Sequence, residues 1–146
     1  MPAENGELFT ELVLEIFRLN GLLLAEGDRI AGKYELSGAR WKVLGAVAIN
    51  GRPMTVAQIG RQMGQARQSV QRIANDMAES GYFAWVDNPS DKRAMLLKLT
   101  AKGKRVYKQL ELEQAPWAID ATNGVGHKEL NCALHVIRQL SDHFGT

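Results

Sequence analysis

The sequence predicts a mainly α-helical protein with a small β-hairpin wing: a winged helix-turn-helix flanked by N- and C-terminal dimerisation helices. Two short helical segments separated by a glycine-containing turn predict the helix-turn-helix. Two apolar segments on either side of a charged, turn-forming stretch predict the hairpin that forms the wing. Long segments with helical periodicity at both ends predict the flanking helices.

The first two helices are predicted at residues 7–30 and 39–49. In both segments apolar residues recur at three- and four-residue spacings, which favours one buried helical face. The second helix is expected to end at Asn50-Gly51, because this pair favours a left-handed C-terminal cap. Pro53 then prevents the helix from resuming at once.

The helix-turn-helix is predicted between Thr55 and Ser80. Thr55 is expected to cap the third helix, with Gln58 at the reciprocal position of a capping box. That helix breaks at Gly64, and the fourth helix runs from Ala66 to Ser80.

The hairpin follows directly. Residues 82–86, YFAWV, are aromatic and β-branched and predict a strand, and the apolar residues 94–99 predict the returning strand. Between them lies DNPSDKR at 87–93, in which Asn-Pro and Ser-Asp are turn-forming pairs. This stretch is the predicted wing tip.

The C-terminal part is predicted to hold a helix that Thr100 caps, which continues past Pro116, and a last helix at 127–144. Together with the first helix, these carry more apolar surface than the winged helix-turn-helix can cover. We therefore expect a homodimer, for which two-fold symmetry is the commonest arrangement. The chain is then one domain of residues 1–146, with the winged helix-turn-helix lobe at 36–100 and the helical dimerisation region at 1–35 and 101–146.

Composition excludes several classes of protein. A content of 45% hydrophobic and 23% charged residues is typical of a folded globular chain and not of a disordered one. No apolar run approaches the roughly 20 residues that a bilayer requires, and the first residues lack the pattern of a secretory signal, so we expect a cytoplasmic location. No Gly-rich phosphate loop, HExxH motif or nucleophile elbow is present, so neither enzymatic activity nor a cofactor is expected.

Positive charge is concentrated in the middle of the chain. Residues 52–108 hold 11 basic and 4 acidic residues, a net charge of +7, whereas the whole chain has only +2. The segments before and after are mildly acidic, at −2 and −3. This asymmetry predicts a polyanion-binding centre within a less charged frame.

The fourth helix is the predicted recognition helix, and no acidic residue occurs from Arg61 to Asn75. Arginine can pair with the edge of guanine, and glutamine or asparagine with that of adenine, in the major groove. A solvated basic face is the alternative, but the preceding turn and the following wing favour DNA. The candidate DNA contacts of this region are Gln65, Arg67, Gln68, Ser69, Gln71 and Arg72.

The wing supplies the second set of candidate DNA contacts. Arg93 is expected to enter a minor groove, whose negative potential attracts arginine. Asp91 could hold its guanidinium through a charge-assisted pair, and Lys92 would meet a phosphate. The alternative is a solvated hairpin end whose charges keep the protein soluble.

The order of helices, the wing and the flanking helices resemble the multiple-antibiotic-resistance regulator (MarR) family of bacterial and archaeal winged-helix regulators. The family's wing has the pattern D-x-x-D-x-R, then a short apolar strand and L-T-x-x-G. The positions that match this pattern are Asp87, Asp91, Arg93, Leu99, Thr100 and Gly103. One departure is Pro116, which interrupts a helix that usually runs unbroken in the family.

The resemblance implies a homodimeric DNA-binding transcription regulator, with repression the expected mode, on a pseudo-palindromic operator in double-stranded DNA. It places the fourth helix in the major groove and Arg93 in the minor groove. It also implies that a small aromatic or anionic effector, or cysteine oxidation, releases the DNA. Arg40 and Trp41 are candidate effector contacts, although packing in the core is the favoured role for Trp41.

Cys132 is the candidate for redox sensing, since a reactive cysteine needs a nearby cation, and Lys128 and His135 lie four residues before it and three after it. Inert packing is the favoured alternative. Cys132 and His135 also have the spacing of metal ligands, and Glu129 could join them, but no full set of three or four ligands is apparent and no metal site is predicted.

Two other functions remain as alternatives: a winged-helix module that binds proteins, and a redox or ligand-binding enzyme that acts through Cys132.

Overall fold

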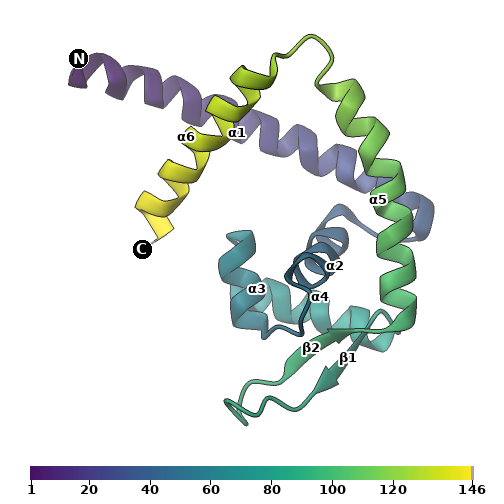
Figure 1. Cartoon of the computed structure of the whole chain (residues 1–146). Helices are drawn as coiled ribbons and strands as arrows, with labels where there is room; N and C mark the ends of the chain where they lie inside the picture. The colour runs from purple at the N-terminus through teal and green to yellow at the C-terminus, as the bar shows by residue number, and fades with distance from the viewer. Residues whose placement is uncertain (146) are drawn as a thin grey trace. The chain divides into compact units, whose positions relative to one another are not determined.

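The computed structural model describes residues 1–145, which form helices and one antiparallel β-hairpin, as predicted (Figure 1). By internal contacts the chain forms two compact units, residues 1–112 and the segment from residue 113 onward. The elements in chain order are α1 (Pro2–Ala31), the short 3-10 helix η1 (Gly32–Tyr34), α2 (Gly38–Asn50), α3 (Val56–Met63), α4 (Arg67–Glu79), β1 (Phe83–Val86), β2 (Leu96–Leu99), α5 (Ala101–Ala121) and α6 (His127–Gly145).

Some element bounds differ from the sequence prediction for local reasons. Helix α1 begins at Pro2, five residues earlier than expected, since the fixed φ of proline suits the first helical position. Strand β1 begins one residue late, because the Tyr82 N–H donates to the Met77 carbonyl at 2.9 Å and so belongs to the end of α4. Strand β2 begins two residues late, because the Ala94 N–H donates to the Asp91 carbonyl at 3.2 Å within a turn.

The predicted cap signals are confirmed at the helices that build the lobe. Thr55 and Gln58 form a complete capping box: the Gln58 N–H donates to the Thr55 hydroxyl at 3.1 Å, and the Thr55 N–H donates to the Gln58 side chain at 2.9 Å. Gly51 and Gly64 end α2 and α3 with φ of +76° and +64°, which is the left-handed region that favours glycine. These caps fix the length of each helix.

The helix-turn-helix depends on a close approach at Gly60. The Gln65 N–H donates to the Gly60 carbonyl at 2.9 Å, and a Cβ added at Gly60 would lie 2.9 Å from the Gln65 carbonyl oxygen. The turn therefore folds directly over α3. The helices pack around fully buried side chains that include Leu44, Ile59, Val70, Ala74 and Met77.

The hairpin is attached to the helical core through β2. Leu97 pairs with Trp85 of β1 on one side. On its other side it forms an isolated antiparallel bridge with Met54, in the connection between α2 and α3. The two backbone hydrogen bonds of this bridge are 2.7 and 3.1 Å long, and both Met54 and Leu97 are buried. The wing is thus fixed relative to the start of α3.

The junction between the hairpin and α5 is equally close. The Thr100 hydroxyl donates to the Gly81 carbonyl at 2.6 Å and accepts from the Gly103 N–H at 3.1 Å, so it caps α5 and ties that helix to the end of α4. Lys102 Nζ donates to the Ser80 carbonyl at 2.9 Å. Gly103 is buried against Tyr82, and a Cβ at Gly103 would overlap the Tyr82 carbonyl oxygen.

The terminal helices leave most of their apolar side chains exposed. In α1 only Ile30 and Ala31 are buried, and no residue from 113 to 145 is buried. Helix α5 continues past Pro116 to Ala121 as predicted, but as one helix, so the interruption expected at Pro116 is wrong. The large exposed apolar side chains of α1 are Leu8, Leu12, Leu14, Phe17, Leu19, Leu22, Leu23 and Leu24, and those of α6 are Leu130, Leu134, Ile137 and Phe144. Among the described residues, no helix is long and apolar enough to span a membrane.

The Gly103 contact gives a test of the fold. Gly103→Ala should lower the free energy of unfolding by about 1–3 kcal/mol, because the added methyl group overpacks the junction with Tyr82. Urea unfolding at a fixed protein concentration measures this. Gly6→Ala is the control, since a Cβ there meets no atom within 4 Å. An unfolding midpoint for Gly103→Ala equal to that of the wild type would show that the junction is looser than described.

Candidate nucleic-acid interface

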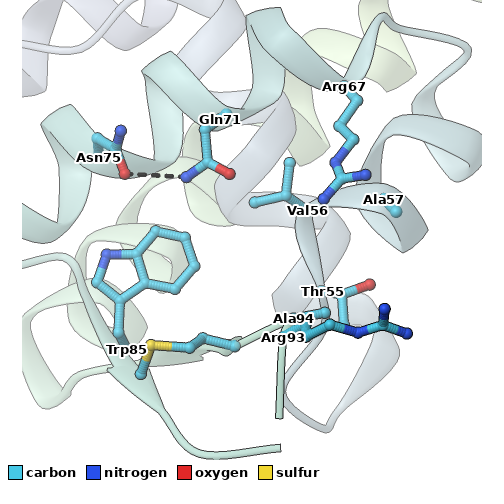
Figure 2. A pocket seen from close by; sticks show the side chains of 10 residues that line it. Thr55, Val56, Ala57, Arg67, Gln71, Asn75, Trp85, Arg93 and Ala94 are labelled. Carbon is cyan, nitrogen blue, oxygen red and sulfur yellow. Dashed lines mark hydrogen bonds between the residues drawn. The ribbon is translucent and has the colours of Figure 1, made fainter. Parts of the chain in front are cut away.

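The outward face of α4 presents the side chains that the sequence singled out. Arg67, Gln68 and Arg72 are exposed, while Ser69 and Gln71 are half-buried. Gln71 Nε2 donates to Asn75 Oδ1 at 3.0 Å, one helical turn further along (Figure 2). This bond fixes the orientation of the Gln71 amide and leaves its oxygen and its second N–H available to a ligand.

Helix α4 carries two arginines in its first half and two carboxylates, Asp76 and Glu79, towards its C-terminal end. Neither Arg67 nor Arg72 forms an ion pair within residues 1–145. Asp76 is the carboxylate nearest to them in the sequence, and Arg40 of α2 pairs with it, with 3.6 Å between Arg40 Nη2 and Asp76 Oδ2. Arg40 thus offsets the negative charge that Asp76 would place beside the arginines.

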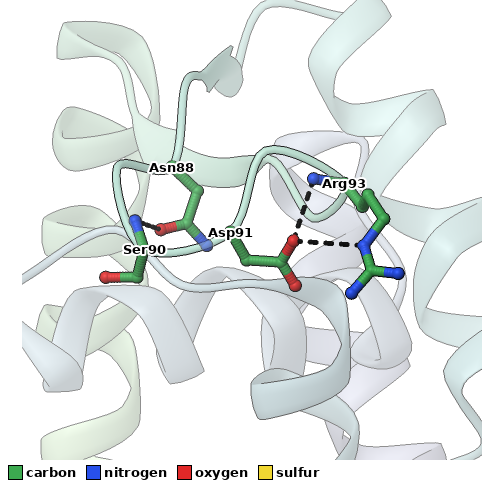
Figure 3. Close-up of polar contacts among 4 residues, drawn as sticks. All are labelled: Asn88, Ser90, Asp91 and Arg93. Carbon is green, nitrogen blue, oxygen red and sulfur yellow. Dashed lines mark hydrogen bonds and ion pairs between the residues drawn. The ribbon is translucent and has the colours of Figure 1, made fainter.

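The wing tip is an ordered pair of turns (Figure 3). Asn88 Oδ1 accepts from the Ser90 N–H at 3.1 Å, and Asp91 Oδ1 accepts from the Arg93 N–H at 3.0 Å. Asp91 Oδ1 also lies 3.6 Å from Arg93 Nε, so the expected ion pair is formed. Because the Arg93 side chain is 94% exposed, this ion pair contributes little to stability. Asp91 acts mainly by ordering the backbone of the loop.

An open cleft of about 290 Å³ separates α4 from the wing (Figure 2). Figure 2 shows Trp85 across the cleft from Gln71 and Asn75, with the guanidinium groups of Arg67 and Arg93 towards its other end. No carboxylate lines the cleft. The complete lining is Thr55, Val56 and Ala57 from the start of α3, Arg67, Gln71 and Asn75 from α4, Trp85 from β1, and Arg93, Ala94 and Met95 from the wing.

Sequence reasoning missed several of these lining residues, above all Trp85. Its signal is its place in β1: it lies two positions after the buried Phe83, on the same face of the strand but closer to the wing tip. An aromatic side chain at that position points at the space beside the wing. The sequence analysis also did not predict Asn75 as the hydrogen-bond partner of Gln71, because an amide pair at this spacing is a weak signal.

The other predicted residues lie in different settings. Gln65 is half-buried in the turn, and its Oε1 is enclosed with no hydrogen-bond partner in the described chain. Trp41 is half-buried at the start of α2. Cys132 is exposed on α6, and within residues 1–145 no three His, Cys, Asp or Glu side chains are grouped to hold a metal ion.

Tyr107, which does not line the cleft, has a shifted pKa. Burial raises the pKa of the Tyr107 phenol above its usual value, and the charge of Glu111 and a hydrogen bond with it raise it further. Tyr107 belongs to α5 and packs beside Gly45 of α2. It therefore does not alter the charge of the α4 face in the neutral pH range.

Comparisons with known proteins agree with this geometry. The sequence model of the MarR family matches residues 34–94. The uncharacterized protein Rv2011c of Mycobacterium tuberculosis is 38% identical over 99 residues, which cover 68% of each chain. CouR from Rhodococcus jostii, solved with p-coumaroyl-CoA, matches with a TM-score of 0.80 over 89% of this chain and 91% of that one, at 15% identity. MarR of Staphylococcus aureus, solved with salicylate and kanamycin, matches with a TM-score of 0.75 over 94% and 92% of the two chains, at 18% identity.

The hydrogen bond at the wing tip can be tested by hydrogen exchange. Asp91→Ala removes the acceptor of the Arg93 N–H, which is worth about 1 kcal/mol, so exchange at the Arg93 amide should accelerate about 5-fold. Asp91→Asn keeps an acceptor oxygen at the same place and should retain most of the protection. NMR-detected exchange gives both rates. Equal acceleration in the two variants would mean that the charge of Asp91, and not its hydrogen bond, orders the loop.

Proposed function

Since this chain belongs to the MarR family of winged-helix transcription regulators, which are non-enzymatic DNA-binding proteins, we propose that it binds operator DNA as a homodimer and represses transcription until a small ligand releases it. The observation that carries this proposal is the cleft between α4 and the wing, which is bordered by Arg67 and Arg93 and lined by no carboxylate.

The cleft has the arrangement that duplex DNA requires. A helix fits the major groove, and an arginine at the tip of a hairpin suits the adjacent minor groove. The two grooves are separated by a single sugar-phosphate strand. With α4 in one groove and the wing in the other, that strand would run through the cleft, between the guanidinium groups of Arg67 and Arg93.

Base recognition is assigned to the outward side chains of α4. Arg67, Arg72 and Gln68 are exposed and able to reach base edges. Gln71, whose amide is oriented by Asn75, retains one acceptor and one donor in a plane, which is the pattern that pairs with adenine. At the wing, Arg93 would enter the minor groove and Lys92 would contact a phosphate. Asp91 orders the loop that carries both side chains.

The homodimer is proposed from the exposed apolar side chains of the terminal helices. Eight large apolar side chains of α1 and four of α6 are exposed, which is more than an isolated soluble monomer normally leaves in water. A two-fold dimer would cover such surface and would place two α4 helices on successive major grooves, about 34 Å apart. The operator would then be pseudo-palindromic.

The proposed effector is a small aromatic or anionic molecule. The similar structures CouR and MarR of Staphylococcus aureus were solved with p-coumaroyl-CoA and with salicylate, respectively. An effector that favours one separation of the two α4 helices would change the match to half-sites that are fixed in space. Arg40 and Trp41 remain candidate contacts, and the Arg40–Asp76 ion pair gives Arg40 a direct link to α4.

Binding to DNA can be tested with a pool of random duplexes and fluorescence anisotropy over a salt series. We expect enrichment of a two-fold-symmetric site. On that site Arg67→Ala and Arg93→Ala should each weaken binding by about 1–3 kcal/mol, or about 5- to 150-fold, through lost base or groove contacts. Lys128→Ala, on α6, is the control cation and should bind as the wild type does. Absence of binding to any duplex at low salt would refute the proposal.

The oligomeric state can be tested by light scattering. The wild type should have twice the 16.2 kDa mass of the chain. Leu134→Glu places a charge within the exposed apolar side chains of α6 and should shift the protein towards the monomer, since burying an unpaired charge is costly. Gln139→Glu, on the polar side of the same helix, is the control and should remain dimeric. A monomeric wild type at micromolar concentration would exclude the proposed dimer.

A further inference from the structure

A second cleft lies on the opposite flank of the wing and carries positive charge of its own. It has a volume of about 1020 Å³ and is bounded by the connection between α2 and α3, the outward side of α3, and residues 88–90 of the wing tip. Its lining includes the guanidinium groups of Arg52 and Arg61 and the amides of Gln62 and Asn88, but no carboxylate. None of these residues was among the DNA contacts that the sequence predicted.

The two arginines of this cleft are not neutralised by the protein. Both are exposed, and neither forms an ion pair within residues 1–145. Elsewhere in the chain Arg18, Arg29 and Arg40 do pair with carboxylates. Two unpaired cations in a cleft that lacks acids produce a positive potential, which fits a polyanion.

The walls of the cleft are held in place by specific contacts. Asn50 Nδ2 donates to the Arg52 carbonyl at 2.9 Å across the left-handed turn at Gly51, which fixes the backbone that carries Arg52. The bridge between Met54 and Leu97 joins this connection to β2. Asn88 Oδ1 accepts from the Ser90 N–H and orders the wing wall (Figure 3). Arg52, Arg61 and the wing are therefore parts of one rigid arrangement.

The wing lies between the two clefts. Residues 93–95 line the cleft beside α4, residues 88–90 line the second cleft, and Thr55 borders both. A minor groove is bounded by two sugar-phosphate strands about 6 Å apart. A wing inserted into that groove must have one strand on each side. In the proposed complex, the cleft beside α4 holds the sugar-phosphate strand that lies between the major and minor grooves. The other sugar-phosphate strand of the minor groove then lies on the side of Arg52 and Arg61.

We propose that this second cleft binds the outer sugar-phosphate strand of the minor groove, with Arg52 and Arg61 as its phosphate contacts. The inference rests on the proposed function and extends it: the footprint of each lobe reaches past the wing to DNA that flanks the half-site. Because phosphates are the same at every position, these contacts add affinity and salt dependence but no base preference. The wing would then contact a sugar-phosphate strand of the DNA on each side.

The test uses the chain of residues 1–146 and the duplex that the wild type selects, made in two lengths. The short duplex ends within the minor groove at each wing, and the long duplex extends about half a helical turn further, about 5 base pairs. The variants are Arg52→Ala/Arg61→Ala and the charge-conserving Arg52→Lys/Arg61→Lys. Lys128→Ala is the control, and circular dichroism melting confirms that each variant is folded. Anisotropy over 50–200 mM salt, roughly a fourfold range, gives affinity and salt slope.

On the long duplex the alanine variant lacks two phosphate contacts, so its salt slope should be smaller by about 1.8. Raising the salt about fourfold should therefore weaken its binding about 12-fold less than it weakens binding by the wild type. On the short duplex the two proteins should bind alike, and the lysine variant should keep the wild-type slope on both. The selected base sequence should not change. If the wild type binds no duplex, the proposed function and this inference fail together. If the wild type binds, but the alanine variant shows the same salt slope as the wild type on the long duplex, only this inference fails.

Discussion

The pairing of Leu97 with two neighbours is the contact on which the surface formed by α4 and the wing depends. Leu97 lies opposite Trp85 in the hairpin and opposite Met54 in the connection between α2 and α3. A two-stranded hairpin alone is marginally stable in water. Pairing on both sides of β2 joins the hairpin to the start of α3, and the buried Leu97 side chain adds apolar contact. The positions of both clefts relative to α4 follow from this single attachment, as does the reach of Arg93.

Charge on this surface is arranged to face outward. Residues 52–108 carry a net +7 in a chain of only +2, yet of the cations within this described range only Arg93 forms an ion pair, with Asp91. Exposed pairs stabilise a fold by little, so leaving Arg52, Arg61 and Arg67 unpaired costs the fold almost nothing. The same unpaired charges give the lobe a strong positive field. Stability and the positive field are therefore supplied by different residues. Packing at Leu97 and Gly103 stabilises the fold, and guanidinium groups at the edges of the clefts supply the field.

The sequence was sufficient for several features that depend on neighbouring residues, although not for the exact bounds of α1, β1 and β2 or for the bond between Gln71 and Asn75. Residues a few positions apart determine where helices form. They also determine the capping box at Thr55, the left-handed end of α2 at Gly51 and the contact between Asp91 and Arg93. The main contacts that the sequence did not reveal join distant segments. The bridge from Met54 to Leu97 spans more than forty positions, and the pairing of Arg40 with Asp76 spans more than thirty. Each needs the tertiary fold before its partners can be known, and the clefts depend on such contacts.

The terminal helices raise a different physical problem, since residues 113–145 contain no buried residue. Ordering a residue costs roughly 1–2 kcal/mol of backbone entropy, and a segment without a core has little burial to offset that cost. A second copy of the chain is the partner that would supply it. In such a dimer the surface that stabilises the terminal helices is also the surface that sets the separation of the two α4 helices. In the proposed dimer, folding of these helices, dimerisation and operator spacing would then be one coupled property. A small ligand that alters the dimer contact would change DNA affinity without touching α4 or the wing.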